Sequence, residues 1–444
     1  MANDWKEASL GDIVNFTPKR TIKKGTTAPF ISMADVTENS KFIKEVFEKE
    51  YTGGGSRFAN GDTLFARITP CLQNGKCSKV SGMENTEIGH GSTEFIVMAA
   101  KMPEYDEDYI YYLARLPKFR AYAESRMIGS TGRQRVSWQD LEEYEFAAPP
   151  PNERKDIGSF LSSLDDKIEL NHQMNETLEA MAQALFKSWF VDFDPVIDNA
   201  LAAGNTIPDE LLERTEQRKA TEIKDNSDIQ KLFPDEFEFT EEMGWIPKGW
   251  ENGILADICS YGKGKINTSE LTLENYVSTE NMNKEKSGIS HAANIASTNQ
   301  VPKFSVGQTL ISNIRPYFKK IWLASFSGGR SNDVLSFQAH KSVANEYLFN
   351  LLYQDSFFDY MTATSKGTKM PRGDKAAIMS WSVAIPSSKL MEEFSELAKP
   401  VYLANNLRSL QTIELAKLRD TLLPKLMSGE LRIPDAARLV DEII

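Results

Sequence analysis

The first half of the sequence returns in its second half, and this internal repeat is the strongest constraint on the fold. Three segments recur in the same order, at offsets that drift only from about 245 to about 237 residues. The matched pairs are Trp5–Ile13 with Trp250–Ile258, Gly61–Pro70 with Gly307–Pro316, and Asp108–Leu113 with Glu346–Leu351. This period is far longer than the roughly 20 to 50 residues of a solenoid repeat. We therefore expect two copies of one domain.

Each copy opens with a stretch of short apolar runs separated by Gly, Asn, Ser and Pro. Thr63–Phe65, Phe95–Met98 and Thr309–Ile311 are examples of such runs. This punctuation predicts many short strands with some helix, and hence an α+β fold. A last strand is expected at Phe146–Ala148 and at Val383–Ile385, because a proline follows each run. The two domains are predicted at residues 1–150 and 244–388.

A long helix is predicted after each domain, at residues 151–194 and 389–434. Apolar residues recur at alternating steps of four and three, which is a heptad pattern. The first series is Ile157, Leu161, Leu164, Ile168, Leu178, Leu185 and Trp189, with Asn171, Asn175 and Ala182 at the open positions. The second is Phe394, Leu397, Val401, Asn405, Leu415, Leu418 and Leu422. Pro424 is expected to kink or end the second helix, and residues 435–444 form a tail.

A helix with one apolar stripe must bury that stripe. We expect the two helices to pack antiparallel as a coiled-coil-like spacer with a strand-rich domain at each end. A helix of some 35 residues spans roughly 50 Å. The alternative is that each helix folds back on its own domain.

The segment between the copies, residues 195–243, is interpreted as an acidic linker. Residues 198–242 hold 13 acidic and 5 basic side chains, whereas the whole chain has a net charge of -12. An acidic chain is unusual for a nucleic-acid-binding protein. Because this segment supplies most of the negative charge, the acidic net charge is only weak evidence against nucleic-acid binding by the rest of the chain.

Cysteine and histidine usage predicts neither disulfides nor a metal site. Cys71, Cys77 and Cys259 are odd in number and lack CxxC spacing, and the four histidines form no ligand motif. No apolar run approaches the roughly 18 residues of a membrane span, and the start of the sequence lacks the pattern of a signal peptide. A reducing compartment, the cytoplasm, is expected.

Several longer segments resemble the specificity subunits of type I restriction–modification systems, and together they cover nearly the whole chain. Leu164–Asn171, Asn175–Met181 and Ala184–Pro195 resemble that family's central conserved helix. Leu232–Asp235 with Gly244–Trp250 resembles the entry to its second recognition domain. Leu418–Leu431 resembles its second conserved region.

The resemblance implies a non-catalytic subunit with two target recognition domains, each reading one half of an interrupted double-stranded DNA site. It implies that the spacer docks methyltransferase subunits, usually two, and that restriction subunits join the full complex. S-adenosylmethionine, ATP and Mg²⁺ would then be bound by the partners and not by this chain. The expected spacer residues are Leu164, Ile168, Leu178, Leu185, Trp189, Leu415, Leu418 and Leu422.

Basic and amide side chains cluster at matching places in the two copies and are the candidates for DNA contact. Lys and Arg neutralise phosphates, and Arg and Gln also read base edges. In the first domain they are Lys19, Arg20, Lys23, Lys24, Arg67, Lys76, Lys79, Arg133, Gln134 and Arg135. In the second they are Lys263, Lys265, Arg315, Lys319, Lys320, Lys366, Lys369 and Arg372. The alternative for each of them is a solvated surface charge.

The sequence lacks the motifs of an independent enzyme. It has no Asn/Asp-Pro-Pro-aromatic methyltransferase signature, no GxGxxG and no Walker A loop, which argues against a fused methyltransferase. Pro208-Asp209 with Glu222-Ile223-Lys224 superficially matches a nuclease pattern but lies in the charged segment. The remaining alternative is a two-domain adaptor that binds protein through a helical spacer.

Overall fold

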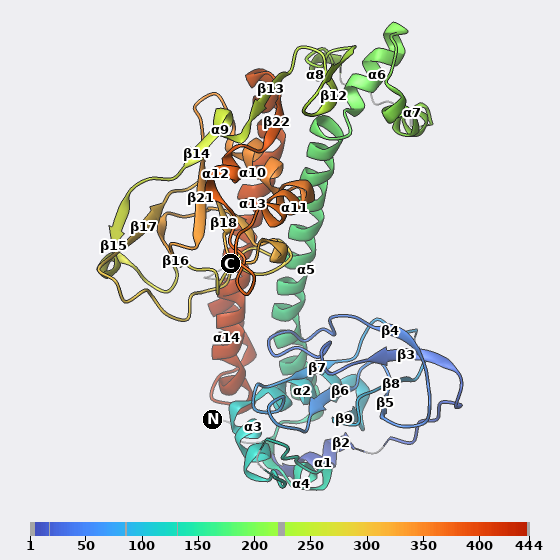
Figure 1. Cartoon of the computed structure of the whole chain (residues 1–444). Coiled ribbons are helices and arrows are strands. Elements are labelled where there is room, and N and C mark those ends of the chain that lie inside the picture. The colour runs from blue at the N-terminus through green and yellow to red at the C-terminus, as the bar shows by residue number, and fades with distance from the viewer. Residues whose placement is uncertain (1–4, 17, 85–86, 131, 221–226, 442–444) are drawn as a thin grey trace. The chain divides into compact units, whose positions relative to one another are not determined.

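The computed structural model describes residues 5–16, 18–84, 87–130, 132–220 and 227–441. The chain divides into two compact units, the first made of two separate stretches of sequence and the second of one continuous stretch. Unit 1 comprises Met1–Gln173 and Arg408–Ile444, and unit 2 comprises Met174–Leu407. Both divisions fall inside the two long helices (Figure 1). Each unit therefore contains one strand-rich domain and parts of both helices.

The domain of unit 1 contains two four-stranded sheets. The first has the order β2-β9-β6-β7 and is antiparallel, with strands Val14–Asn15, Phe95–Ala100, Thr63–Ala66 and Cys77–Lys79. The second has the order β4-β3-β8-β5, with strands Phe47–Glu50, Thr27–Ile31, Gly89–Gly91 and Ser56–Phe58. Strands β3 and β8 are parallel. Strand β1 (Lys6–Ser9) pairs antiparallel with β10 (Glu145–Ala148). The helices are α1 (Leu10–Ile13), α2 (Pro103–Arg115), α3 (Pro117–Ser125) and α4 (Trp138–Glu142).

The domain of unit 2 repeats the strand order of the antiparallel sheet, whereas one edge strand of its second sheet pairs with a different neighbour. Its antiparallel sheet has the order β14-β21-β18-β19, with strands Cys259–Tyr261, Val334–Ala339, Thr309–Ser312 and Ile321–Leu323. Its second sheet has the order β15-β17-β20-β16, with strands Lys265–Asn267, Gln300–Phe304, Gly328–Arg330 and Tyr276–Val277. Strands β16 and β20 are parallel, as β3 and β8 are. Strand β13 (Glu251–Ile254) pairs with β22 (Ser382–Ile385). The helical elements are α9 (Leu255–Ile258), η2 (Thr268–Glu270), η3 (Pro316–Phe318), α10 (Asn345–Tyr353), α11 (Asp355–Ala363) and α12 (Lys375–Met379).

The predicted α+β class and the long antiparallel helices are confirmed. Helices α5 (Pro151–Phe190) and α13 (Ser388–Met427) have 40 residues each. In unit 1, Asn171 Nδ2 donates to Gln411 Oε1 at 3.0 Å. In unit 2, Asn175 and Asn405 each donate from Nδ2 to the other's backbone carbonyl at 3.3 Å. In unit 1 the lower-numbered Asp165 pairs with the higher-numbered Arg419, and in unit 2 the higher-numbered Gln183 bonds to the lower-numbered Tyr402, so the two helices are antiparallel within each unit.

The predicted seam is largely buried. Leu164, Trp189, Leu415, Leu418 and Leu422 are buried, and Ile168, Leu178 and Leu185 are half-buried. Leu397 was placed on the seam wrongly: it is 45% exposed, and Ala398 is buried instead. A step of four residues from Phe394 fits the helical turn better at that point than a step of three.

The helices also pack on the domains, as the alternative interpretation held. In unit 1, Ile157 and Leu161 of α5 share a core with Tyr109 and Phe119 of the domain, and Leu422 and Leu426 of α13 join it. In unit 2, a second core combines residues of both helices with domain residues; it includes Phe186, Trp189, Phe190, Tyr347 and Phe394. The apolar stripe of each helix therefore packs partly against the other helix and partly against a domain.

Residues 195–220 and 227–243 contain regular secondary structure, so the idea of a plain acidic linker is corrected. The elements are α6 (Asp194–Ala203), η1 (Asp209–Leu211), α7 (Leu212–Lys219), α8 (Ser227–Gln230) and β11 (Phe237–Thr240), which pairs with β12 (Gly244–Pro247). Val196, Ile197 and Phe233 are buried. Arg214 binds Asp194 at 2.6 Å and Arg218 pairs with Asp198, so part of the acidic charge is neutralised locally.

The second long helix does not end at Pro424 but continues to Met427. The expected tail holds a further helix, α14 (Ile433–Asp441), whose Ala436 is buried. Proline removes one N–H from the helical ladder but leaves the remaining bonds intact. Among the described residues, no helix is long and apolar enough to cross a membrane.

Candidate nucleic-acid interface

Two loops lie at equivalent places in the two domains, beside the ends of β6 and β18. In the first domain, Arg67 N donates to Glu94 O at 3.0 Å, and Val136 N donates to Arg67 O at 3.1 Å. In the second, Asn313 N donates to Asp333 O at 2.8 Å, and Gly373 N donates to Asn313 O at 3.2 Å. The same backbone frame therefore holds the loop that precedes Val136 and the loop that precedes Gly373.

The loop of the first domain closes on itself through backbone hydrogen bonds. Ile128 and Arg135 exchange N–H···O bonds at 2.9 Å, and Arg135 also bridges to Ile68. Gly129 and Gly132 have φ values of 138° and 79°, a region that glycine adopts without strain. Arg133 is exposed, and the backbone N and O of Gln134 bond to Thr69. Thr131 lies outside the described residues.

The loop of the second domain closes in the same manner. Lys366 and Arg372 exchange backbone bonds at 2.8 and 2.9 Å, and Arg372 bridges to Ile314. Arg315 N donates to Pro371 O at 2.8 Å. Lys369 is exposed at the tip, whereas the Lys366 ammonium pairs with Asp374.

An arginine at the end of each loop forms an ion pair with a carboxylate. Arg135 Nη2 lies 2.6 Å from Glu94 Oε1, and Arg372 Nε lies 3.1 Å from Asp333 Oδ1. Hydrogen bonding from Arg135 outweighs the effect of burial and lowers the pKa of the Glu94 carboxyl. The carboxylates raise the pKa of both Arg135 and Arg372. Neither carboxylate was predicted from the sequence, although the repeat offset relates Glu94 to Asp333.

A basic hollow of about 220 Å³ lies in the first domain next to this loop. It is lined by Arg20, Arg57 and Arg67, together with Phe16 and Trp138, whose rings are stacked 6.2 Å apart. Among the described residues, Arg67 Nε has no hydrogen-bond acceptor. Arg20 is held by Asp62, with Nη2 donating to Oδ1 at 2.9 Å. Arg57 was missed by the sequence reasoning because it lies within a short strand and not in a basic cluster.

The other candidate cations fall into two groups. Five are exposed: Lys19, Lys23, Lys24, Lys263 and Lys265. The rest contact the protein itself and support its loops. Two form ion pairs: Lys79 with Asp108 at 2.8 Å and Lys319 with Asp355 at 2.7 Å. Two donate to backbone carbonyls: Lys76 to Met33 O and Lys320 to Thr279 O. The Arg315 guanidinium lies 6.0 Å from the ring of Phe318. Sequence patterns do not distinguish the two groups, because each basic residue is adjacent to loops.

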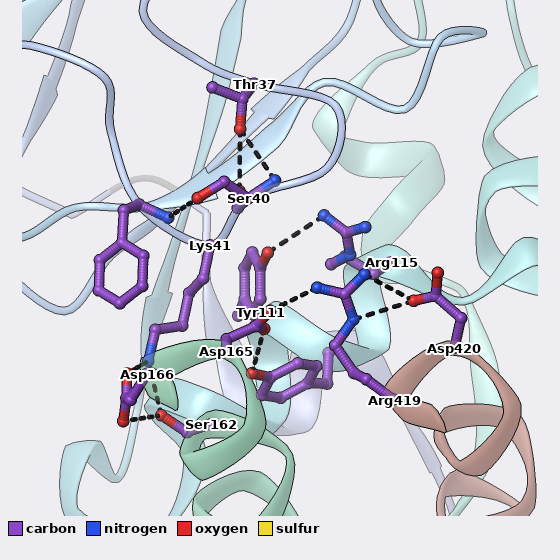
Figure 2. Close-up of polar contacts among 12 residues, drawn as sticks. Thr37, Ser40, Lys41, Tyr111, Arg115, Ser162, Asp165, Asp166, Arg419 and Asp420 are labelled. Carbon is purple, nitrogen blue, oxygen red and sulfur yellow. Dashed lines mark hydrogen bonds and ion pairs between the residues drawn. The ribbon is translucent and has the colours of Figure 1, made fainter. Parts of the chain in front are cut away.

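A buried polar network attaches the first domain to the helices of unit 1 (Figure 2). Asp165 of α5 accepts a hydrogen bond from Tyr112 of α2 at 2.6 Å and pairs with Arg419 of α13. Burial lowers the pKa of Arg419, but the carboxylates of Asp165 and Asp420 outweigh it and raise the pKa overall. Burial and the nearby Asp165 carboxylate raise the pKa of Tyr112. These contacts fix the orientation of the domain on the helix pair.

The described part of the chain contains no group of three or more His, Cys, Asp or Glu side chains suited to a metal ion. Of the nuclease-like pattern, Asp209 begins η1. Glu222, Ile223 and Lys224 lie outside the described residues.

Comparisons with known proteins agree with the fold and with the motifs. A model of the type I restriction modification DNA specificity domain matches residues 2–180. The type I restriction enzyme HindI specificity subunit of Haemophilus influenzae is 27% identical, over 97% of this chain and 100% of that protein. The MjaIX specificity subunit of Methanocaldococcus jannaschii is 28% identical, over 74% of this chain and 70% of that protein.

A solved structure also resembles this chain. The crystal structure of the type I restriction-modification system S subunit from M. genitalium covers 96% of this chain, with 97% of its own chain matched, a TM-score of 0.54 and 13% identity. At this identity the likeness concerns the fold alone. Taken with the sequence similarities, these findings confirm the resemblance: residues 2–180 match the type I restriction modification DNA specificity domain, and the chain is similar over nearly its whole length to a type I restriction enzyme specificity subunit.

Proposed function

We propose that this chain is the non-catalytic subunit that reads a two-part DNA target for a type I restriction–modification complex. Each recognition domain would contact one half of an interrupted double-stranded site. The observation that carries this proposal is the recurrence of one anchored basic loop in both domains, ending at Arg135 and at Arg372. A duplicated reading element fits a bipartite target, because each half-site then has its own module.

The acidic net charge does not oppose this proposal strongly. Residues 198–242 contribute 5 minus 13, or -8, to the total of -12, which leaves -4 for the remainder. The candidate interface of the first domain is itself basic, with Arg20, Arg57, Arg67 and Arg133 on one domain. Local positive potential, and not the net charge of the chain, governs attraction to phosphates.

Both long helices expose apolar side chains that a partner would cover. On α5 these are Leu170, Met174 and Met181, and on α13 they are Leu397, Leu403, Leu407, Leu410 and Ile413. Met181 is 62% exposed and Leu407 is 66% exposed. Exposed apolar groups that follow a helix are typical of a protein interface. We assign these exposed groups to contacts with methyltransferase subunits, two copies according to the family resemblance, with restriction subunits joining the full complex.

The chemistry would belong to those partners. In this proposal S-adenosylmethionine is bound by the methyltransferase subunits, and ATP and Mg²⁺ by the partner subunits, while this chain supplies DNA recognition and docking. The enzyme activity is therefore a property of the complex.

The decisive test is a genome-wide map of methylated adenines in cells that carry the complete operon, with and without this gene. A bipartite motif with a fixed gap should be present with the gene and absent after its deletion. If the motif persists without the gene while the partners are expressed, this chain is not the specificity subunit.

The second candidate is a two-domain adaptor that binds protein and not DNA, which the acidic net charge favours. DNA binding distinguishes the two candidates, because neutralised phosphates release counterions and make the affinity fall with salt. For the complex of this chain with its methyltransferase partners, we expect the affinity for duplex DNA to fall steeply between 50 and 200 mM salt, by roughly tenfold or more. Salt-independent or undetectable binding supports the adaptor.

A further inference from the structure

The arginine at the end of each recognition loop is gripped along one edge only. In the first domain, Arg135 donates from Nε to Glu94 Oε2 at 2.9 Å and from Nη2 to Glu94 Oε1 at 2.6 Å. In the second, Arg372 donates from Nε to Asp333 Oδ1 at 3.1 Å and from Nη2 to Asp333 Oδ2 at 3.4 Å. Both carboxylates therefore hold the Nε–Nη2 edge of a guanidinium.

Because the carboxylate binds the Nε–Nη2 edge, the other edge of the guanidinium, formed by Nη1 and Nη2, keeps N–H groups that can donate to another molecule. The two arginine side chains are 42% and 51% exposed, so neither is enclosed by the protein. Arg135 Nη1 makes one weak contact, at 3.3 Å to Arg133 O, and keeps a further N–H. Guanine presents O6 and N7 side by side in the major groove, and a planar pair of arginine donors matches them.

The carboxylate makes the pair better suited to a base edge than to a phosphate. Its charge cancels that of the arginine, so the pair gains little from phosphate neutralisation. It also fixes the plane of the guanidinium before binding, which reduces the side-chain entropy that bidentate recognition would otherwise cost. A residue that only attracts phosphate needs neither feature.

The arrangement recurs although the residues around it differ. The first domain uses Glu94 and the loop Gly129–Arg135, whereas the second uses Asp333 and the loop Lys366–Arg372. In both, the backbone carbonyl of the carboxylate residue accepts from the residue that follows the core strand, Arg67 or Asn313. The backbone frame thus places the same side-chain pair in two loops of different sequence.

We propose that Arg135 and Arg372 each read one guanine in the half-site of their own domain, and that Glu94 and Asp333 are positioning residues that orient them. This inference rests on the proposed function as a DNA-reading subunit. It assigns one G·C pair in each half-site to a named residue.

The test is the map of methylated adenines in cells that carry the complete operon with variant forms of this gene. Arg135→Ala should make one G·C position degenerate in one half-site, and Arg372→Ala should do so in the other half-site. The preference for guanine at that position should fall roughly 5- to 150-fold, the range found for a bidentate base contact. Arg135→Lys should not restore it, because lysine cannot donate from a planar fork.

The positioning role has its own readout. Glu94→Gln should relax the same position as Arg135→Ala, and the double variant should relax it no further. A purely structural role would instead lower the thermal stability and weaken methylation at all positions alike. Arg133→Ala is the matched control: it removes a neighbouring exposed arginine and should weaken methylation without changing the motif.

Three results would overturn the inference. The first is a wild-type motif with a half-site that contains no G·C pair. The second is an unchanged motif, with uniformly weaker methylation, in the Arg135→Ala and Arg372→Ala variants, which would make both residues phosphate contacts. The third is relaxation of the same half-site by both variants. In each case deletion of the gene would still abolish the motif, whereas a motif that survives deletion refutes the proposed function itself.

Discussion

Arg419 of α13 pairs with Asp165 of α5, and each side chain is only 3% exposed. Tyr112 of the first domain donates to the same carboxylate at 2.6 Å. The triad therefore connects two helices and a domain inside unit 1. In unit 2 the corresponding tyrosine position is taken by Asn350, which accepts from Tyr402 at 3.0 Å. Equivalent domains are thus attached to the helices through different polar groups.

The triad yields a prediction about stability. Arg419→Met leaves the Asp165 carboxylate buried without its cation, which should cost about 3–5 kcal/mol of unfolding free energy. The triple variant Arg419→Met, Asp165→Leu, Tyr112→Phe removes the three buried members together and leaves only the exposed Asp420 carboxylate. It should lie within about 1–2 kcal/mol of the wild type, because apolar replacement of a complete buried pair is often neutral. Calorimetry of the full chain measures both. Equal losses in the two variants would contradict this account.

Thiol reactivity tests the burial of two cysteines. Burial raises the pKa of Cys77 to about 12 and that of Cys259 to about 12. At pH 8 only about one in ten thousand of such thiols is ionised, and the thiolate is the reactive form. Cys71 is only half-buried. Mass spectrometry after brief treatment with iodoacetamide should show modification at Cys71 alone in the native chain.

Denaturant supplies the control for that measurement. All three cysteines should react once the chain is unfolded. Rapid modification of Cys77 or Cys259 in the native protein would show that the cores around them open readily.

Asp355 binds Lys319, one of the candidate DNA-contact residues, and should make the stability of unit 2 depend on pH in the acid range. Its carboxylate accepts from Lys286 at 2.8 Å and from Lys319 at 2.7 Å, and these hydrogen bonds lower its pKa to about 2. A depressed carboxyl pKa contributes stability that is complete above the unfolded value of about 3.9 and is lost as the pH falls toward 2. Asp355→Asn should therefore flatten the profile of melting temperature against pH between about 4 and 2.

The effect will be modest, because the Asp355 side chain is 63% exposed. Asp359→Asn, an exposed change on the same helix, is the matched control and should keep the wild-type slope. A wild-type slope in Asp355→Asn as well would mean that solvent screens the two lysine contacts completely.

Much of the fold could be predicted because the two halves of the sequence repeat the same pattern of apolar residues. The apolar runs identified β6, β9 and β10 of the first domain and β18 and β22 of the second, and the heptad spacing identified the helices through Leu164, Trp189 and Leu415. Periodicity could not show that Leu422 and Leu426 of the second helix pack with the first domain, since this depends on tertiary contact between distant segments. It also misplaced Leu397, where Ala398 satisfies the buried position.

The candidate interface was harder to predict than the fold. Clusters of basic residues pointed to the loops that end at Arg135 and Arg372, and the contact of these loops with DNA stays a prediction. Their carboxylate partners lie 41 and 39 residues away in sequence, so no local pattern connects them. The ion pair of Lys79 with Asp108 could not be predicted for the same reason. A charge is assigned to a partner or to solvent only by the tertiary structure.

The exposed apolar residues of α5 and α13 give a prediction about partner docking. Met181 is 62% exposed, so Met181→Glu should change the melting temperature of the isolated chain little, since surface substitutions usually alter stability by about 0.5 kcal/mol or less. If a methyltransferase subunit covers this residue, the new carboxylate would be buried without a partner. Binding of the purified methyltransferase should then weaken by about tenfold or more.

His172→Glu is the control for this prediction, because it adds the same charge at an exposed site of α5 nine residues away, half a helical turn around the axis. It should bind the methyltransferase like the wild type. Calorimetric titration of the methyltransferase into each purified chain separates the cases. Loss in Met181→Glu alone supports a partner on the apolar face, because only burial makes the added charge costly. Equal loss in both variants points to general electrostatic repulsion, and wild-type binding in both removes Met181 from the docking surface.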